Sequence, residues 1–209
     1  MMYSIAYSIS GIGAYLIGSV PTSFLFAKAL KGIDIRQHGS GNVGATNVYR
    51  VVGKLPGLLT LIVDILKGVL AASFLPGFIY HVFGVPCGLD QKIVFGFLAI
   101  CGHIWTPFLR FKGGKGVATT IGVLGILLPK LLVWYLLVWV IAFSFSRFVS
   151  LGSVVAGVSL PFLALIYDQS ITVVLFAVIL CSINTYKHKE NIKRLIMGVE
   201  SKTHLFRKK

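Results

Sequence analysis

The chain has 209 residues, of which 56% are hydrophobic and only 12% are charged. Soluble domains carry about 25% charged residues, so this composition excludes an ordinary soluble protein and indicates an integral membrane protein. Twenty Lys and Arg stand against six Asp and Glu, a net charge of +14. In a membrane chain we attribute this excess to topology and to anionic ligands or lipid headgroups, and we expect no nucleic-acid partner.

Apolar segments long enough to be membrane spans follow one another along the chain. A span needs roughly 20 apolar residues, and the sequence predicts seven, at about 3–27, 55–75, 92–109, 117–129, 131–146, 152–167 and 170–186. Pro129 separates the short fourth segment from the fifth. These two segments can alternatively be one long broken segment.

The basic residues predict the orientation of these spans. With seven spans and a cytoplasmic C-terminus, seventeen of the twenty Lys and Arg residues lie on the inner side, as the positive-inside rule requires. We therefore expect an all-α polytopic membrane helix bundle with seven transmembrane helices, the N-terminus outside, the C-terminus cytoplasmic, and a single domain over 1–209. In this topology four polar stretches share the cytoplasmic face, and we expect one common site from 38–50, 112–120, 147–153 and 187–202.

The first polar stretch, GSGNVGATNVYR at 39–50, has the composition of an anion-binding loop. Its glycines let backbone N–H groups converge on a ligand, and Arg50 adds a forked cation suited to phosphate oxygens. Neutral side chains supply further donors. A plain turn between helices is the alternative, because glycine and asparagine also favour turns. The candidates are Gly39, Ser40, Gly41, Asn42, Gly44, Thr46, Asn47 and Arg50.

The second stretch places Lys112-Gly113-Gly114-Lys115-Gly116 directly before an apolar segment. Glycines and a lysine before a helix N-terminus make an anion site, since free N–H groups and the positive end of the helix dipole point the same way. It is not a Walker A loop, because Leu109 and Gly116 occupy positions where Gly and Ser or Thr are required. A basic loop that only fixes topology is the alternative. We interpret nearby His103 as a packed or interfacial residue rather than a catalyst.

The last two stretches carry Ser153, at an expected helix start, and His188, Asn191 and Arg194 at a spacing of three. Ser153 can simply cap its helix. The spacing of three places the other residues along one helix flank, where His188 could exchange a proton near neutral pH. The alternative is a basic surface helix that binds anionic lipid.

Asp64 and Lys67 are charged residues within the second apolar segment. Intramembrane charges are costly and suggest function, for example lining the path of a phosphate-ester transporter, but a self-neutralising pair is a structural alternative. The six acidic residues form no cluster and the three cysteines no pairing pattern. We therefore expect no metal and no cofactor, and a chemistry that depends on positioning and charge stabilisation.

The polar stretches resemble the signature blocks of one family, the bacterial glycerol-3-phosphate acyltransferases that use acyl phosphate as donor. The resemblance rests on GSGN at 39–42, GATNVYR at 44–50, FKGGKGVAT at 111–119, and NIKRL at 191–195 with Glu200 and Lys202. The upstream GSVPTS at 18–23 and DILKG at 64–68 also look like this family. One departure is Thr106, which stands where the family commonly has proline, and it leaves the exit from this helix uncertain.

The resemblance implies an enzyme of the bacterial inner membrane with a cytoplasmic active site. It would transfer an acyl group from acyl phosphate to sn-glycerol 3-phosphate, giving lysophosphatidic acid and phosphate, and would depend on the enzyme that supplies acyl phosphate. The catalytic candidates are Ser40, Arg50, Lys115, His188 and Asn191. The substrate-binding candidates are Gly39, Gly41, Asn42, Thr46, Asn47, Lys112, Gly113, Gly114, Ser153, Arg194 and Glu200. The rivals are a transporter of a phosphate ester and, less favoured because it needs no glycine cradle, a lipid-binding structural protein.

Overall fold

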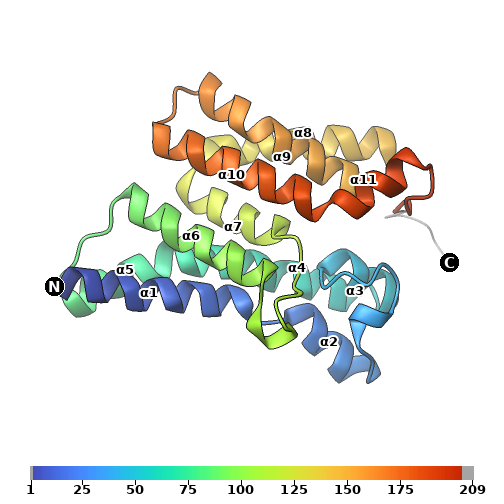
Figure 1. Cartoon of the computed structure of the whole chain (residues 1–209), viewed down its shortest axis with the longest axis horizontal. Helices are drawn as coiled ribbons and strands as arrows, with labels where there is room; N and C mark the ends of the chain where they lie inside the picture. Colours follow the sequence, from blue (N-terminus) through green and yellow to red (C-terminus); the bar gives the residue numbers. More distant parts are fainter. Residues whose placement is uncertain (1, 204–209) are drawn as a thin grey trace. The chain divides into compact units, whose positions relative to one another are not determined.

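Helices supply all the regular structure of residues 2–203, which are the residues that the computed structural model describes (Figure 1). The expected all-α fold is confirmed for this part of the chain. By its internal contacts the chain separates into two compact units, divided between Leu128 and Pro129.

The first unit contains the helices α1 to α7 and three short 3₁₀ or π-helical turns between them. Its elements are α1 Met2–Ser19, α2 Thr22–Lys31, η1 Ile35–Gln37, α3 Ala45–Val51, α4 Lys54–Val69, η2 Leu70–Phe74, α5 Leu75–Phe83, α6 Leu89–Ile104, η3 Pro107–Leu109 and α7 Val117–Leu127. The first apolar segment breaks between α1 and α2 because Pro21 lacks the N–H that would continue the helix. A second break, at Gly32 with a φ of 67°, ends α2 and starts the first polar stretch.

One long helical segment, α4–η2–α5, runs from Lys54 to Phe83 and contains a short π-helical turn. The turn, Leu70–Phe74, lies just before Pro76. A proline inside a helix removes one hydrogen bond and its ring clashes with the preceding turn. The wider π turn relieves that clash, so the segment continues past Pro76 instead of ending there.

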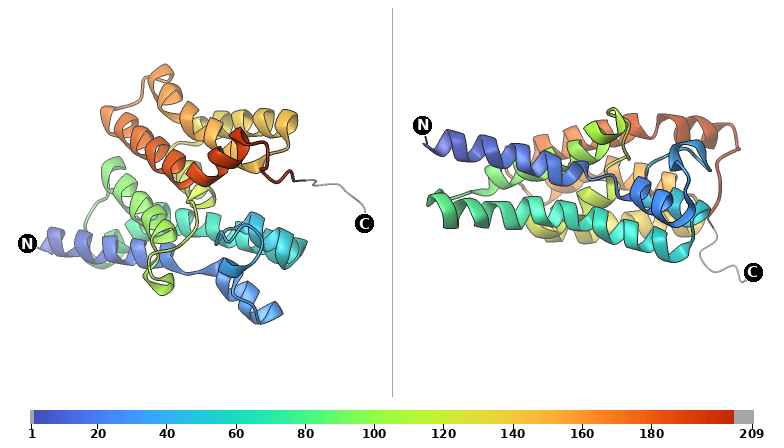
Figure 2. Two further views of the ribbon diagram at one scale, coloured as in Figure 1. Left: turned by 45° about the vertical axis from the view of Figure 1, so that its right-hand side comes forward. Right: turned by 90° about the horizontal axis from the view of Figure 1, so that it is seen from below.

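Reciprocal glycines bring two helix pairs of the first unit into backbone contact. A Cβ on Gly18 of α1 would overlap the carbonyl of Ala99 in α6, and a Cβ on Gly102 of α6 would overlap the carbonyl of Tyr15. The pair of α4 and α7 repeats this arrangement with Gly68 and Gly122. Small residues at such crossings are typical of membrane helices, where lipid is as apolar as leucine and close van der Waals contact holds helices together. Helix α1 packs against α6, as the left view of Figure 2 shows.

The second unit is built from α8 Pro129–Ser146, α9 Val149–Ile166, α10 Ile171–Lys187 and α11 Lys189–Ile196. Helix α9 packs against both α8 and α10. The turn from α8 to α9 is tight, and it forces Arg147 into the left-handed region with a φ of 62°. Helices α10 and α11 meet at His188 with a bend of 58°.

The predicted spans correspond to helices, but their lengths differ. Within the described residues five helical segments are long and apolar enough to cross a membrane, and a sixth is added if the bent pair of α10 and α11 counts as one span. The remaining expected span is α7, which has 11 residues and is shorter than the roughly 20 that a bilayer requires. Helix α7 ends at Leu127 and α8 begins at Pro129, so the fourth and fifth segments are separate helices.

Candidate functional site

Asn47 organises the first polar loop from inside. Its side-chain oxygen accepts the N–H of Ser40 at 2.9 Å, while its amide nitrogen lies 2.9 Å from the His38 carbonyl and 3.1 Å from the Asn42 carbonyl. The residue is 1% exposed. The hydrogen bonds of Asn47 therefore hold the loop in its observed conformation. The sequence-based prediction that Asn47 also donates to a substrate stays a prediction.

Two glycines of this loop adopt backbone conformations that other residues rarely reach. The φ angles of Gly39 and Gly41 are 61° and 70°. A Cβ on Gly39 would also overlap the Asn47 amide that holds the loop. These glycines are thus needed for the tight turn around Asn47. Their presence does not distinguish a plain turn from an anion-binding loop, because both require glycine at these positions. Ser40 is exposed at the surface of the turn, and so is Arg50 in the last turn of α3.

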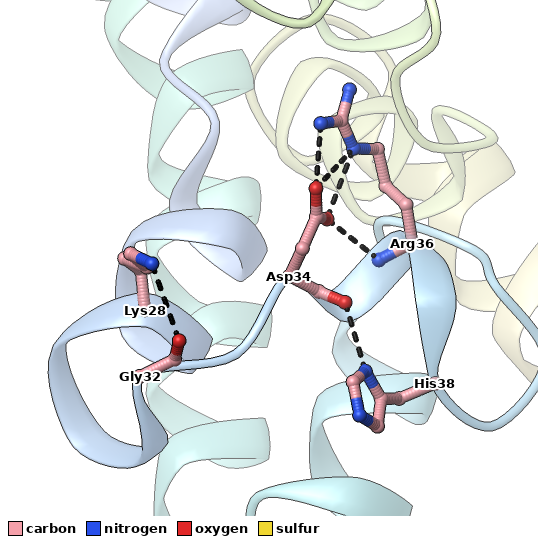
Figure 3. A network of polar contacts seen from close by, with 5 residues as sticks. All are labelled: Lys28, Gly32, Asp34, Arg36 and His38. Atoms are coloured by element: carbon pink, nitrogen blue, oxygen red, sulfur yellow. Dashed lines mark hydrogen bonds and ion pairs between the residues drawn. The ribbon is translucent and has the colours of Figure 1, made fainter.

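An ion pair fixes the chain just before this loop (Figure 3). The Arg36 guanidinium lies 2.6 Å from the Asp34 carboxylate, which also accepts the Arg36 N–H at 3.0 Å. The hydrogen bond from Arg36 lowers the pKa of Asp34 below its usual range. The His38 ring is 3.0 Å from the Asp34 carbonyl. This network orders residues 34–38 at the entrance of the loop, and sequence reasoning did not single it out.

The second polar loop folds back on the end of α6. The N–H groups of Gly113 and Gly114 donate to the carbonyls of Ile104 and His103, at 3.1 Å and 3.0 Å. Helix α7 starts at Val117, directly after the glycines, as the sequence predicted. Thr106, the departure from the family pattern, is buried and donates to the Ser19 carbonyl at 2.6 Å, so its hydroxyl ties the exit of α6 to the end of α1.

The structure brings these two loops together. A Cβ on Gly114 would stand 2.9 Å from the Val43 carbonyl, so only glycine allows the second loop to approach the first so closely. Beneath them, side chains of both loops and of α2 share one small hydrophobic cluster formed by Ala27, Ile35, Val43, Val48 and Leu109. The first unit therefore brings the polar stretches 38–50 and 112–120 together, and the common site predicted from all four stretches stays a prediction. Among their polar side chains Lys112 is exposed, and Asn42, Thr46 and Lys115 are half-buried.

Glu200 is the centre of the corresponding cluster in the second unit. Its carboxylate accepts from the Ser150 hydroxyl at 2.7 Å, the Asn191 amide at 2.6 Å and the Arg194 guanidinium at 2.6 Å. The side chain of Glu200 is 6% exposed. The bond between Glu200 and Arg194 ties α11 to the chain that follows it. The sequence-based prediction that Glu200 and Arg194 contact a substrate stays a prediction.

A second set of hydrogen bonds in this unit connects the start of α9 to the end of α10. The Asn184 amide donates to the Ser153 carbonyl at 2.8 Å, and the indole of Trp139 donates to the Ser153 hydroxyl at 3.2 Å. The His188 ring lies 2.9 Å from the Asn184 carbonyl, and His188 is buried. The stretches 147–153 and 187–203 are thus gathered in the second unit, as the first two stretches are in the first unit.

Three residues of these networks escaped the sequence analysis. Ser150 was passed over for Ser153, and neither Asn184 nor Trp139 was considered. The available signal was Asn184, a polar residue within an apolar helix four positions before His188. Hydrogen bonds between distant parts of the chain, such as that from Ser150 to Glu200, cannot be recognised from neighbouring residues in the sequence.

Asp64 and Lys67 form a buried ion pair, with 2.6 Å between the Lys67 ammonium and the Asp64 carboxylate. This geometry corresponds to the self-neutralising alternative, and it gives no support to a charged transport path. Across residues 2–203, no group of three or more His, Cys, Asp and Glu side chains is arranged to hold a metal ion.

The Glu200 cluster predicts a pH-dependent stability. Burial alone would raise the pKa of Glu200, but the bonds from Ser150, Asn191 and Arg194 outweigh burial and lower it below the ordinary value of 4.5. A lowered pKa contributes stability that is fully present above that value and is lost as the pH falls through the folded-state pKa.

We expect Glu200→Gln to lower Tm by roughly 5 °C at pH 7, with the difference shrinking below pH 4.5. Thermal unfolding of the purified protein measures this, and a difference that does not depend on pH would contradict it. Glu190→Gln, at an exposed position on α11, is the control.

The long apolar helices of the described residues, with most of their large hydrophobic side chains facing outward, define an integral membrane protein. Residues 8–198 match the sequence profile of a family described as glycerol-3-phosphate acyltransferase. The chain belongs to this glycerol-3-phosphate acyltransferase family, which confirms the family resemblance drawn from the motifs.

Several relatives and solved structures resemble the chain over nearly its whole length. Glycerol-3-phosphate acyltransferase 2 of Moorella thermoacetica is 46% identical over 189 residues, which are 90% of this chain and 93% of the relative. The enzyme of Endomicrobium trichonymphae is 43% identical over the whole of both chains. A crystal structure of PlsY (YgiH), an integral membrane glycerol 3-phosphate acyltransferase in its glycerol 3-phosphate form, is 36% identical and superposes with a TM-score of 0.83 over 95% of this chain and 96% of that chain. A lysophosphatidic acid form of PlsY gives a TM-score of 0.80.

Proposed function

We propose that the protein transfers an acyl group from acyl phosphate to sn-glycerol 3-phosphate, giving lysophosphatidic acid and phosphate. This is the first step of phospholipid biosynthesis, and it links the protein to the enzyme that supplies acyl phosphate. The observation that carries the proposal is the close approach of the two glycine-rich loops at Val43 and Gly114, in a chain of this family. The glycerol 3-phosphate and lysophosphatidic acid forms of PlsY support the acceptor and the product.

The proposed topology has seven spans in the bacterial inner membrane, with the N-terminus outside and the C-terminus and active site cytoplasmic. The distribution of Lys and Arg supports it. For α7 to be the additional span, its 11 residues would have to cross a locally thinned bilayer or a region covered by protein. The chain acts as one catalytic domain in this proposal, with both polar clusters serving the same reaction.

The side chains divide by role in this proposal. Arg50 and Lys115 neutralise the phosphate charge, and Ser40, His188 and Asn191 orient the reacting groups. The glycines of the two loops allow the substrates to approach the backbone closely, and Lys112 holds the substrates, assisted by Asn42, Thr46 and Ser153. Support comes from the exposure of Ser40, Arg50 and Lys112. Asn47, Arg194 and Glu200 act through the segments they position.

The reaction needs little beyond alignment and charge stabilisation, because acyl phosphate is already activated. The glycerol hydroxyl oxygen attacks the acyl carbon, a C–O ester bond forms, and the C–O bond to phosphate breaks. The departing phosphate takes the hydroxyl proton, and Arg50 and Lys115 stabilise the charge that develops on it. Such positioning and electrostatic effects are among the largest contributions to enzymatic rate.

Replacing His188 tests the route of the proton. If a substrate phosphate is the acceptor, His188→Gln, which cannot exchange a proton, should retain kcat within about tenfold at saturating substrates, since general acid–base catalysis typically contributes 10²–10⁴. The measurement is kcat, with binding of both substrates determined separately. A loss of several orders of magnitude with binding intact would assign the proton to the histidine.

A panel of acyl donors tests the function itself. Purified protein in lipid is expected to release phosphate only when acyl phosphate and sn-glycerol 3-phosphate are both present, with lysophosphatidic acid as co-product. Activity with acyl-CoA and none with acyl phosphate would overturn the donor assignment. Movement of a phosphate ester across proteoliposomes with no chemical product would identify a transporter instead.

A further inference from the structure

Three ionisable side chains lie buried in the first unit behind the candidate loops. Asp64, Lys67 and His103 are 2%, 4% and 9% exposed. The Asp64 carboxylate is 2.6 Å from the Lys67 ammonium and 3.7 Å from Nδ1 of His103. We call this group the buried triad. Charges within a membrane segment are costly and usually serve a purpose, and the mechanism above uses none of these three residues.

The buried triad lies at two helix ends, the break between α1 and α2 and the C-terminal end of α6. Besides its bond to Asp64, the Lys67 ammonium donates to the carbonyl of Val20 at 2.6 Å, in the break between α1 and α2. His103 belongs to the last turn of α6. The triad therefore connects α4 to two helix ends, and the end of α6 leads directly into the second polar loop.

His103 also holds that loop through its backbone and its ring. Its carbonyl accepts the N–H of Gly114 at 3.0 Å. A Cβ on Gly114 would overlap Nε2 of the His103 ring, so the ring lies directly against the backbone of the loop. Gly114 in turn approaches the Val43 carbonyl of the first loop. A displacement of His103 would thus be transmitted to both loops.

A small cavity of about 10 Å³ lies where these groups meet. Both loops and the triad contribute to its wall, through Val43, Asp64, Lys67, His103, Gly113 and Gly114 among others. Its size leaves the triad little room to rearrange. The triad is therefore packed against the underside of the loops.

We propose that the buried triad positions the two glycine-rich loops for substrate binding. The ion pair at Asp64 fixes the His103 ring and the end of α6, and these fix Gly113 and Gly114 relative to Val43. A directional polar network can specify one arrangement where packing of apolar side chains alone would allow several. The inference rests on the proposed function in one respect, that the loop at 112–116 binds a phosphorylated substrate. Asp64, Lys67 and His103 are positioning residues here and touch no substrate.

The test removes both charges together, because a single substitution would leave an unpaired buried charge and destabilise the fold for that reason alone. In Asp64→Asn/Lys67→Met we expect a rise in the KM of one phosphorylated substrate of about tenfold or more. The affected substrate is identified with Gly114→Ala, which displaces the loop directly and should raise the same KM. A purely structural pair would change the yield of folded protein and leave KM unchanged.

Amide hydrogen exchange of the peptide covering 104–116 gives a second readout that needs no activity. Exchange of this peptide should become several-fold faster in the double variant and in His103→Phe, which leaves the ion pair intact and is used if the double variant does not fold. Thr60→Val is the matched control, because Thr60 is also buried on α4 but donates only locally, to the Pro56 carbonyl. Unchanged KM and unchanged exchange in folded variants would overturn the positioning role. Absence of acyl transfer in the unmodified protein would overturn the proposed function. The exchange of the 104–116 peptide would then decide by itself whether the buried triad positions this loop.

Discussion

Replacing Lys115 by methionine is expected to reduce kcat by about 10²–10³, the usual effect of removing one group that stabilises charge in the transition state. Lys115 lies between Gly114, which approaches the Val43 carbonyl, and the first turn of α7. Methionine keeps much of the length and apolar character of the side chain and removes the ammonium charge. The measurement is phosphate release at saturating acyl phosphate and sn-glycerol 3-phosphate, with Tm as a check on folding.

Lys130→Met is the matched control for this variant. Lys130 is exposed in the first turn of α8, and the proposed topology places it on the outer side. The control should retain activity within about twofold, as surface substitutions generally do. If Lys115→Met retained more than a tenth of the activity while folding normally, the ammonium would have no catalytic role.

The second large effect is expected from Asn47→Asp. The substitution preserves the size of the side chain and the acceptor for the Ser40 N–H, but it removes the bonds donated to the carbonyls of His38 and Asn42. It also places a carboxylate at a site that is 1% exposed. Leaving such buried groups unsatisfied costs about 1–3 kcal/mol for each group. We expect the loop to lose its turn and kcat/KM to fall by about 10² or more.

Gln37→Glu introduces the same change of charge ten residues earlier, at an exposed position, and serves as the control for Asn47→Asp. It should change kcat/KM by less than about threefold, because an exposed charge is screened by solvent. Equal losses in the two variants would attribute the effect to charge near the site rather than to the hydrogen bonds of Asn47.

Hydropathy and local motifs were sufficient to predict much of the fold. The apolar segments predicted helices at nearly the observed positions, since a chain in lipid must satisfy its backbone hydrogen bonds within each segment. The start of α7 after Gly116 followed from the glycine-lysine loop. The break at Pro21 and the π turn before Pro76 were not predicted, because both depend on how a proline is accommodated by the surrounding chain.

For the candidate site, the motifs predicted which residue types gather, and the role of each residue stays a prediction. The glycines of the motifs and Lys112 lie in loops, and Arg50 lies in the last turn of α3. Asn47 and Glu200 were predicted as substrate contacts, and the structure adds hydrogen bonds within the protein that the sequence did not predict. The identity of a polar residue in a motif does not show whether its side chain contacts a ligand or stabilises the loop that contacts the ligand. The distinction depends on burial and on partners distant in sequence, as with Ser150 and Glu200, which a single sequence does not contain.

The backbone contacts at the glycine crossings also limit how the first unit can move. Where Gly18 meets Ala99 and Gly68 meets Thr119, no side chain separates the helices that could rotate or compress to absorb a displacement. Sliding or spreading of α1 against α6, or of α4 against α7, would break these contacts without compensation from lipid. In the proposed function, we therefore expect the connecting segments, rather than a separation of these helices, to accommodate the admission and release of reactants.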